Sequence, residues 1–339
     1  MHPLSTTCHT AFQILARKHA LCAVMLFAAM CCRPPAAQAE PLKTVVYASG
    51  TAVPSTVILV AQEQGYFARE GLEVRIENCI GAFRCMLDMM EGKAQFSSAG
   101  DLAVMFNGVD RKDFVILATY SSSTSLLKLV TRKSAHIEKA QDLVGKRVGI
   151  IKRSASHYFL DNFLLLEGVE PKSVEHVFLD QEDMSAALQN GSVDAISTFE
   201  PVAGKQLAAI GKDGFEVSVP PYNLSTHLVA MRKTAMQSRT ETIKLLRAMD
   251  RAVQFIAAEP KKAKAILARR SGMDAASVDA VWAGSQFKLV LDPSLQVTLN
   301  SVARWARNEN LISDTQIPEF SNFIYPEPLN AAKAKGVGK

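Results

Sequence analysis

The chain has 339 residues, of which 48% are hydrophobic and 21% charged, and its formal net charge is +5. Residues 1–39 hold three of the 38 Lys and Arg residues and none of the 33 Asp and Glu residues, so the rest carries a net charge of only +2. This near-neutral balance gives no support to nucleic-acid binding. The remaining 300 or so residues, at ordinary apolar content, can bury a good core and are expected to form two domains.

Residues 1–39 are predicted to be a cleaved signal peptide. Basic residues at 17–19 precede an apolar run at 20–30, which is shorter than the roughly 20 residues that span a bilayer as a helix. The small-x-small sequence at 37–39 suits a signal peptidase and would make Glu40 the first mature residue. Lipid attachment at Cys31 or Cys32 is the alternative, although lipoprotein processing favours a small residue before the cysteine. The mature chain is expected to be soluble and periplasmic.

Cysteine usage fits an exported protein. Four of the six cysteines lie in the predicted leader, which leaves Cys79 and Cys85 in the mature chain. Their short separation makes a disulfide possible in an oxidising compartment, and geometry decides whether it forms. Two cysteines without a neighbouring pair of histidines are a weak metal signal, so no metal ion or cofactor is predicted.

The hydrophobic pattern predicts alternating strands and helices. The first elements form a β-α-β unit, for which a parallel strand pair with a helical crossover is expected. Strands are predicted at 42–48, 72–76, 94–98, 114–120, 126–131, 147–151, 174–179, 193–198 and 226–231, and helices at 55–64, 83–91, 102–107, 157–166, 184–189, 243–256 and 263–270. Asp274 and Asp292 are predicted N-caps of two further helices.

A strand-to-helix turn at residues 152–157 is the first candidate for a binding site. Ser154 or Ser156 is a plausible N-cap, and the free N–H groups of the first helical turn attract anions. Lys152, Arg153 and His157 add positive or hydrogen-bonding groups beside them. The competing interpretation is that the serines only cap the helix and the cations are solvated.

Three segments resemble a family of exported solute-binding proteins. The segments at 61–67, 70–74 and 142–149 are similar to hallmark sequences of the ABC importer components that bind nitrate, taurine and other sulfonates, and of related binders of a thiamine-precursor pyrimidine. The resemblance runs from about Thr44 to about Leu311. It implies an α/β fold of the periplasmic binding protein type II class, with a ligand cleft between two lobes joined by two crossover strands.

The resemblance also sets the expected domain limits. Lobe 1 is expected at 43–131 plus 230–325 and lobe 2 at 132–229, with hinges near 130–133 and 226–231 and a flexible tail at 330–339. Ligands of open α/β sheets bind beyond the carboxyl ends of the strands. The candidate ligand-binding residues are those in the polar turns at such ends: Thr51, Ser98, Asp101, Ser123, Ser154, Ser156, His157 and Glu200.

Several of these residues have two interpretations. Glu200 and Asp101 can pair with an amine on a ligand, or each can be a carboxylate that a helix start favours. His157 can donate to an anion, or it can only cap or stack. His227, on a crossover strand, is expected to be structural.

The predicted function is binding of a small organic solute, a sulfonate or similar anion, and its delivery to an ABC permease in the inner membrane by a monomer. Alternatives are a pyrimidine or aromatic ligand, a sensor partner that docks on a membrane receptor, and an exported enzyme on the same fold. The aromatic alternative would use Tyr47, Tyr66, Phe67, Tyr158, Phe199 and Tyr222. No Gly-x-Ser-x-Gly elbow or His/carboxylate metal spacing supports the enzyme.

Overall fold

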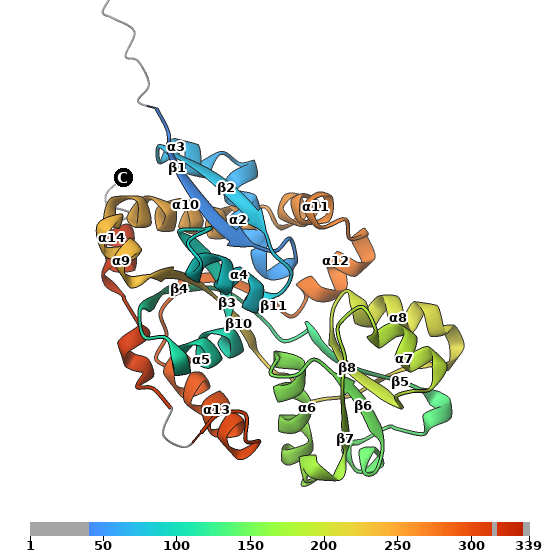
Figure 1. The fold of residues 1–339 in the computed structure, drawn as a ribbon. Coiled ribbons are helices and arrows are strands. Elements are labelled where there is room, and N and C mark those ends of the chain that lie inside the picture. The colour runs from blue at the N-terminus through green and yellow to red at the C-terminus, as the bar shows by residue number, and fades with distance from the viewer. Residues whose placement is uncertain (1–40, 314–316, 335–339) are drawn as a thin grey trace, which may run out of the picture. The chain divides into compact units, whose positions relative to one another are not determined.

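The computed structural model describes residues 41–313 and 317–334 (Figure 1). The predicted signal peptide and its cleavage site lie outside the described residues. Within the described part of the chain, no helix combines the length and the apolar character needed to cross a membrane. The described residues from Leu42 onward form one compact unit, which contains two β-sheets with helices packed against them.

The first sheet has six strands in the order β11-β4-β10-β3-β1-β2. Strands β1, β2 and β3 are parallel, whereas β10 runs antiparallel to both β3 and β4. The strands are β1 (Lys43–Ser49), β2 (Leu72–Asn78), β3 (Phe96–Gly100), β4 (Phe114–Ser123), β10 (Leu224–Met231) and β11 (Ser285–Val290). The helices between them are α2 (Thr56–Glu63), α3 (Tyr66–Arg69), α4 (Ala82–Met90) and α5 (Asp101–Asp110), with η1 (Val53–Ser55) before α2.

The second sheet has five strands in the order β7-β6-β8-β5-β9. Strand β6 is parallel to β7 and β8, and β5 is antiparallel to β8 and β9. The strands are β5 (Leu127–Arg132), β6 (Arg147–Ile150), β7 (Glu175–Phe178), β8 (Ala195–Phe199) and β9 (Gly214–Val217). The helices are α6 (Ala155–Leu166), α7 (Met184–Asn190), α8 (Val202–Ile210), η2 (Lys133–Ala135), η3 (Ala140–Leu143), η4 (Pro171–Ser173) and η5 (Gly211–Asp213).

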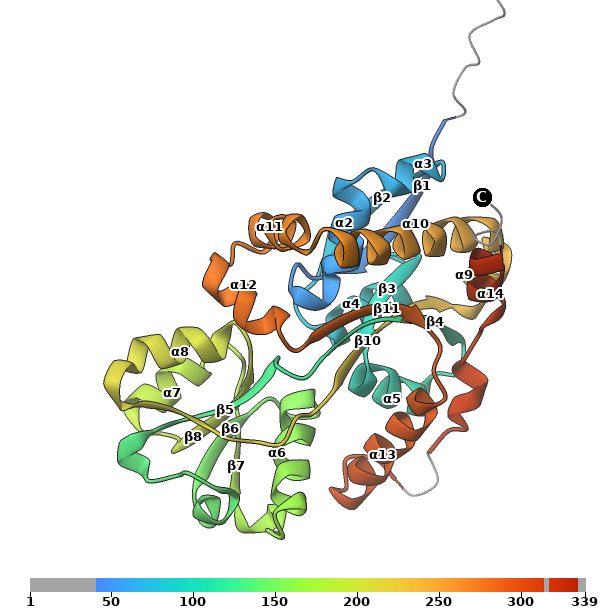
Figure 2. The ribbon, with the colours of Figure 1, turned by 180° about the vertical axis from the view of Figure 1, so that it is seen from behind.

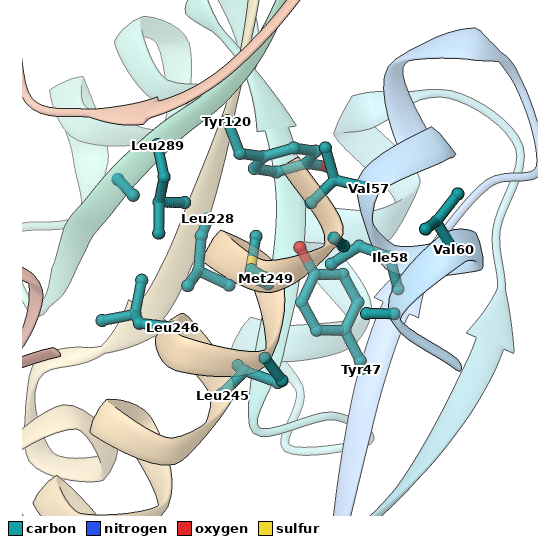
Figure 3. Packing of buried hydrophobic residues seen from close by; sticks show 14 of the residues in the cluster. Tyr47, Val57, Ile58, Val60, Tyr120, Leu228, Leu245, Leu246, Met249 and Leu289 are labelled. Atoms are coloured by element: carbon teal, nitrogen blue, oxygen red, sulfur yellow. The ribbon is translucent and has the colours of Figure 1, made fainter. Parts of the chain in front are cut away.

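The C-terminal third of the chain is mainly helical and covers the first sheet (Figures 1 and 2). Its helices are α9 (Arg232–Gln237), α10 (Arg239–Ala258), α11 (Pro260–Ser271), α12 (Ala275–Trp282), α13 (Ser294–Asn308), η7 (Phe320–Phe323) and α14 (Glu327–Ala334). One apolar cluster joins α2 and α10 to the sheet, and Figure 3 shows Met249 beside Leu228 and Tyr47 there. A second cluster joins α5 and α13 to the sheet and includes Ala155 and Phe159 of α6.

Two sequence predictions at the C-terminus need correction. Residues 330–334, predicted as part of a flexible tail, belong to α14, because Leu329 and Ala332 are buried in the first apolar cluster. Asp274 caps α12 as predicted, by accepting from the Ser277 N–H at 2.8 Å. Asp292 lies one residue before the N-cap of α13, although its side chain accepts from the Ser294 N–H at 2.8 Å.

The segments that connect the two sheets also differ from the expected hinges. Strand β5 pairs only within the second sheet, and β10 pairs only within the first. The connections are therefore residues 124–126 and 218–223, and not the segments near 130–133 and 226–231. Strand β4 runs on to Ser123, three residues beyond its predicted end, because β10 and β11 pair with it across Ser121 and Ser122.

Cys79 and Cys85 form a disulfide across the start of α4, which settles the possibility that the sequence left open. The bond closes a loop with a sequence separation of 6. Loop-closure entropy gives a bond of that span a stabilisation of about 2 kcal/mol.

We predict that a reductant lowers the free energy of unfolding of the wild-type chain by about 2 kcal/mol, measured by urea denaturation. The Cys79→Ser/Cys85→Ser variant should match the reduced wild type and show no further response to reductant. An equal response in both proteins would contradict the prediction, since both carry the same other cysteines.

Candidate functional site

The predicted site residues lie where parallel strands end. In the first sheet, β1, β3 and β4 run in one direction, so their carboxyl ends share one edge of the sheet. Strands β6 and β8 are parallel as well, so their carboxyl ends share one edge of the second sheet. Both edges adjoin a connecting segment, because β4 leads into 124–126 and the Glu200 N–H donates to the Leu126 carbonyl at 2.8 Å. The polar turns of both sheets therefore flank the chain segments that join them.

Ser98 lies in a buried network of hydroxyl groups. Its Oγ is 2.9 Å from Ser49 Oγ and 2.6 Å from the Tyr120 hydroxyl, and Ser49 also reaches Ser55 at 2.9 Å. Burial raises the pKa of Tyr120 to about 12. These groups satisfy one another, so Ser98 holds β1 against β3 and β4.

Asp101 begins α5 and is almost completely buried, at 1% exposed. Its Oδ1 lies 2.9 Å from His227 Nε2, and its Oδ2 accepts from the Ser225 N–H at 3.2 Å. His227 Nδ1 lies 2.9 Å from Thr119 Oγ1. This order of hydroxyl, imidazole and carboxylate is the one that activates a nucleophile. Thr119 is only 8% exposed and His227 is fully buried, so the chain of contacts ties β10 to β4 and α5, in agreement with the structural role expected of His227.

Ser123 and Thr51 lie at the same edge of the first sheet. Ser123 is buried, and its Oγ is 3.1 Å from Ser125 Oγ and accepts from Ser285 Oγ at 3.2 Å. Thr51 is half-buried in the turn between β1 and η1. Of the predicted residues of this sheet, Thr51 thus has the most accessible side chain.

The turn before α6 has the predicted cap. Ser154 is the N-cap, and its Oγ accepts from the Ser156 N–H at 3.2 Å and donates to the Ile151 carbonyl at 2.7 Å. Ser156 is fully buried, with its Oγ 2.9 Å from that of Ser154. The two cations stack on aromatic rings: Lys152 lies 5.0 Å from the centre of Phe178, and Arg153 lies 4.3 Å from that of Phe106.

The His157 ring contacts the turn through Nδ1 and faces Asp161 through Nε2. Arg153 N–H points at its Nδ1 over 3.4 Å, and its Nε2 lies 3.4 Å from Asp161 Oδ2. Its ring packs edge-on against Trp305 of α13 with centroids 5.0 Å apart. Burial lowers the pKa of His157 to about 4, so its ring is neutral at neutral pH. This placement does not favour the expected donation to an anion in the turn.

Glu200 follows β8 and is half-buried. Its Oε2 accepts from the Gly204 N–H at 3.1 Å in the first turn of α8, which is the helix-start interpretation that the sequence allowed. Burial raises the pKa of Glu200 above its ordinary value, against the lowering effect of that hydrogen bond.

The aromatic residues divide into two groups. Tyr47 and Phe67 are buried in the first apolar cluster, so they are closed to a ligand. Tyr66 is half-buried and packs against that cluster, with Arg69 5.1 Å from the centre of its ring. Tyr158, Phe199 and Tyr222 pack against the second cluster, where the Tyr158 and Tyr222 rings lie 5.6 Å apart. Burial raises the pKa of both tyrosines, and the charge of Asp101 adds to the rise, which places them near the edge of the first sheet.

Sequence reasoning missed several residues. The hydroxyls of Thr198 and Tyr222 are buried without a hydrogen-bond partner, one at the end of β8 and the other on the 218–223 connection. The position of Thr198 at a strand end was a usable signal, whereas Tyr222 was named only as a residue that could stack on an aromatic ligand. A pocket of about 340 Å³ lies between α6, η4 and α13, and its lining includes Tyr158, Asn162, Lys172, Ser301, Trp305 and Glu309 but none of the predicted site residues.

Comparison with known proteins assigns a family. Residues 53–263 match the model of the NMT1/THI5-like family, and the chain belongs to that family. The chain is 27% identical over 217 residues to a putative thiamine biosynthesis protein of Haemophilus influenzae, covering 61% of this chain and 66% of the relative. It is 27% identical over 178 residues to the taurine-binding periplasmic protein of Escherichia coli, covering 52% and 53%. The chain thus spans between half and two thirds of the length of these relatives.

Solved structures confirm the periplasmic binding protein fold. The periplasmic aliphatic sulphonate binding protein of Escherichia coli superposes with a TM-score of 0.72 at 16% identity, covering 84% of this chain and 97% of that one. The desulfurization enzyme DszB superposes with a TM-score of 0.62 at 15% identity, covering 87% and 99%. At these identities the likeness shows the fold alone, and the fold serves both a binding protein and an enzyme.

We predict that Asp101→Ala lowers the free energy of unfolding by about 3 kcal/mol, because it removes a buried hydrogen-bond acceptor from His227 and from the Ser225 N–H. Urea denaturation measures the change. Asp110→Ala, at the exposed end of the same helix, is the matched control and should stay within about 0.5 kcal/mol of wild type. A loss below about 1 kcal/mol for Asp101→Ala would contradict the structural role.

We predict that Glu200→Gln raises the free energy of unfolding above that of the wild type at pH 7 but not near pH 4. Because the folded-state pKa of Glu200 is raised, the folded chain binds more protons than the unfolded chain between the two pKa values, and wild-type stability falls as pH rises through that window. Gln keeps an acceptor for Gly204 and does not titrate. Urea denaturation at pH 7 and near pH 4 should show the gain only at pH 7, with the exposed Glu138→Gln as control; an equal effect at both pH values would refute it.

Proposed function

We propose that this chain is an exported solute-binding protein that captures a small anion, best a sulfonate, and delivers it to an ABC permease. The single observation that carries the proposal is the position of the capped α6 start, at a carboxyl strand end of the second sheet and close to the connections with the first. The family and the binding proteins among its relatives support it.

The local chemistry of the α6 start favours an anion. The helix has 12 residues and its N-terminal N–H groups carry partial positive charge. Ser154 and Ser156 supply hydroxyls there, and Lys152 is exposed. Thr198 near the end of β8, Tyr222 on the 218–223 connection and Thr51 at the edge of the first sheet offer further hydroxyl groups to the oxygens of such a ligand.

An aromatic or pyrimidine ligand is the second candidate, and one arrangement favours it. Tyr158 and Tyr222 form an edge-on pair, and the Tyr222 hydroxyl is buried without a hydrogen-bond partner. A flat ligand with a polar edge would stack against such rings and accept that hydroxyl proton. Glu200 is then available to an amine on the ligand.

The mechanism we propose follows from the two connections. A ligand that contacts both sheet edges stabilises the conformation in which these edges are close together. The size of this effect is set by how much more tightly the ligand binds that conformation than the one in which the edges are apart. Movement would occur at 124–126 and 218–223. A periplasmic location, a monomeric state and a permease partner belong to this proposal, and we place lobe 1 around the first sheet and lobe 2 around the second.

The test is a thermal-shift and calorimetric screen against taurine, alkanesulfonates, nitrate and pyrimidines, since a ligand of the folded state raises the melting temperature. We expect a sulfonate to bind, and Ser154→Ala to weaken it about tenfold, the equivalent of one hydrogen bond to a charged group. Asp274→Ala is the matched control, because it removes an N-cap of similar worth from α12.

Each result separates the candidates. Equal sulfonate affinity in wild type and Ser154→Ala would remove the α6 start from the site. A shift with pyrimidines alone would support the tyrosine pair. Chemical conversion of the bound ligand would identify an enzyme, and the absence of any shift would contradict solute binding of these classes.

A further inference from the structure

We propose that His157, Asp161 and His176 form a binding site for one divalent transition metal ion of the zinc type. His157 and Asp161 lie one turn apart on α6, which is a His/carboxylate spacing that the sequence prediction of no metal overlooked. His176 lies on the neighbouring strand β7. Their potential ligand atoms all lie within 4.8 Å of one another. The site shares His157 with the turn at residues 152–157, but it does not rest on the function proposed above.

The cluster contains three buried polar atoms that lack hydrogen-bond partners. They are His157 Nε2, Asp161 Oδ1 and His176 Nε2, and all three belong to the same small group of side chains. The His157 and Asp161 side chains are 3% and 0% exposed. Buried polar groups are normally paired, so three converging unpaired atoms indicate a missing common partner.

The spacing of the atoms fits a metal ion. His176 Nε2 is 3.1 Å from Asp161 Oδ1, and the potential ligand atoms of all three residues lie within 4.8 Å of one another. His157 Nε2 is 3.4 Å from the other carboxylate oxygen, Oδ2. Bonds of about 2.0–2.1 Å to zinc, arranged tetrahedrally, separate neighbouring ligand atoms by roughly 3.3 Å. Two imidazoles and one carboxylate are ligands that zinc accepts, with a fourth position left for water.

The surroundings support a cation. Trp305 Nε1 donates to Asp161 Oδ2 at 2.8 Å, which orients the carboxylate so that Oδ1 faces His176, as partners outside the first ligand shell do. Burial raises the pKa of Glu309 and the negative charge of Asp161 adds to the rise, so a second carboxylate lies close by. The His176 side chain is 15% exposed, which gives an ion a route to the cluster.

Metal binding would change one contact of His157. The Arg153 N–H points at His157 Nδ1 over 3.4 Å, which requires the proton of the neutral ring to be on Nε2. A metal on Nε2 moves that proton to Nδ1, where it meets the Arg153 N–H. The long contact is therefore lost on loading, and the backbone just before Ser154 must shift away from His157.

The experiment compares Zn²⁺ and Co²⁺ binding to the full chain and to His176→Gln by calorimetry and by the visible absorption of Co²⁺. His136→Asn is the matched control, since it removes an exposed histidine remote in sequence from the cluster. Wild type and both variants share all other cysteine and histidine residues, so a difference in metal binding between His176→Gln and the other two proteins reports on the cluster. Circular dichroism without metal checks that each variant is folded.

We expect wild type and His136→Asn to bind one more Zn²⁺ than His176→Gln, or the same number at least tenfold more tightly. Asp161→Asn, which keeps an oxygen for Trp305, should resemble His176→Gln and lose the Co²⁺ absorption of an N/O site. Identical Zn²⁺ stoichiometry and affinity in wild type, His176→Gln and Asp161→Asn would overturn the proposal and leave a His–Asp ion pair only.

Discussion

The buried carboxylate of Asp101 is the contact on which the arrangement of the first sheet edge depends. It lies where β3 passes into α5, and it holds both the His227 ring and the Ser225 backbone of β10. Strand β10 starts directly after the 218–223 connection, so this carboxylate fixes the point at which the chain returns from the second sheet. A carboxylate in so dry a position is tolerated because its acceptors are filled by the chain itself.

Much of the fold could be predicted from local sequence, because strands and helices differ in hydrophobic period and glycines stop the helices. What local sequence could not show is which strands pair. The residues of β5 and β10 were recognised as strands, but their sheet depends on partners such as Phe199 and Ser98, distant along the chain. The same applies to Ser121–Ser123, which have the composition of a loop and become strand through pairing with β11.

The positions of the candidate site residues could be predicted from the sequence, but not whether their side chains are free to bind a ligand. The rule that ligands bind at carboxyl strand ends located Ser98, Ser154 and Glu200 at such ends. It could not show that Ser98 is already bonded to Ser49 and Tyr120, or that the His157 ring turns to Asp161 and Trp305. Hydroxyl and imidazole groups form hydrogen bonds with the polar atoms that packing places within about 3 Å. Those atoms belong to other helices and strands, distant along the chain.

Helix α6 connects two polar clusters, the serines at its start and the group of His157, Asp161 and His176. Ser154 caps the helix and Ser156 lies in its first turn, and further along it Asp161 is tied to Trp305 of α13. Helices α6 and α13 lie side by side in both views (Figures 1 and 2). Tyr158 also packs on Trp305, with ring centres 5.1 Å apart. Because packed side chains adopt discrete arrangements, α6 cannot shift against the first sheet without giving up these contacts with Trp305. The orientation of the α6 start toward the connections is thus set by the indole as well as by its own sheet.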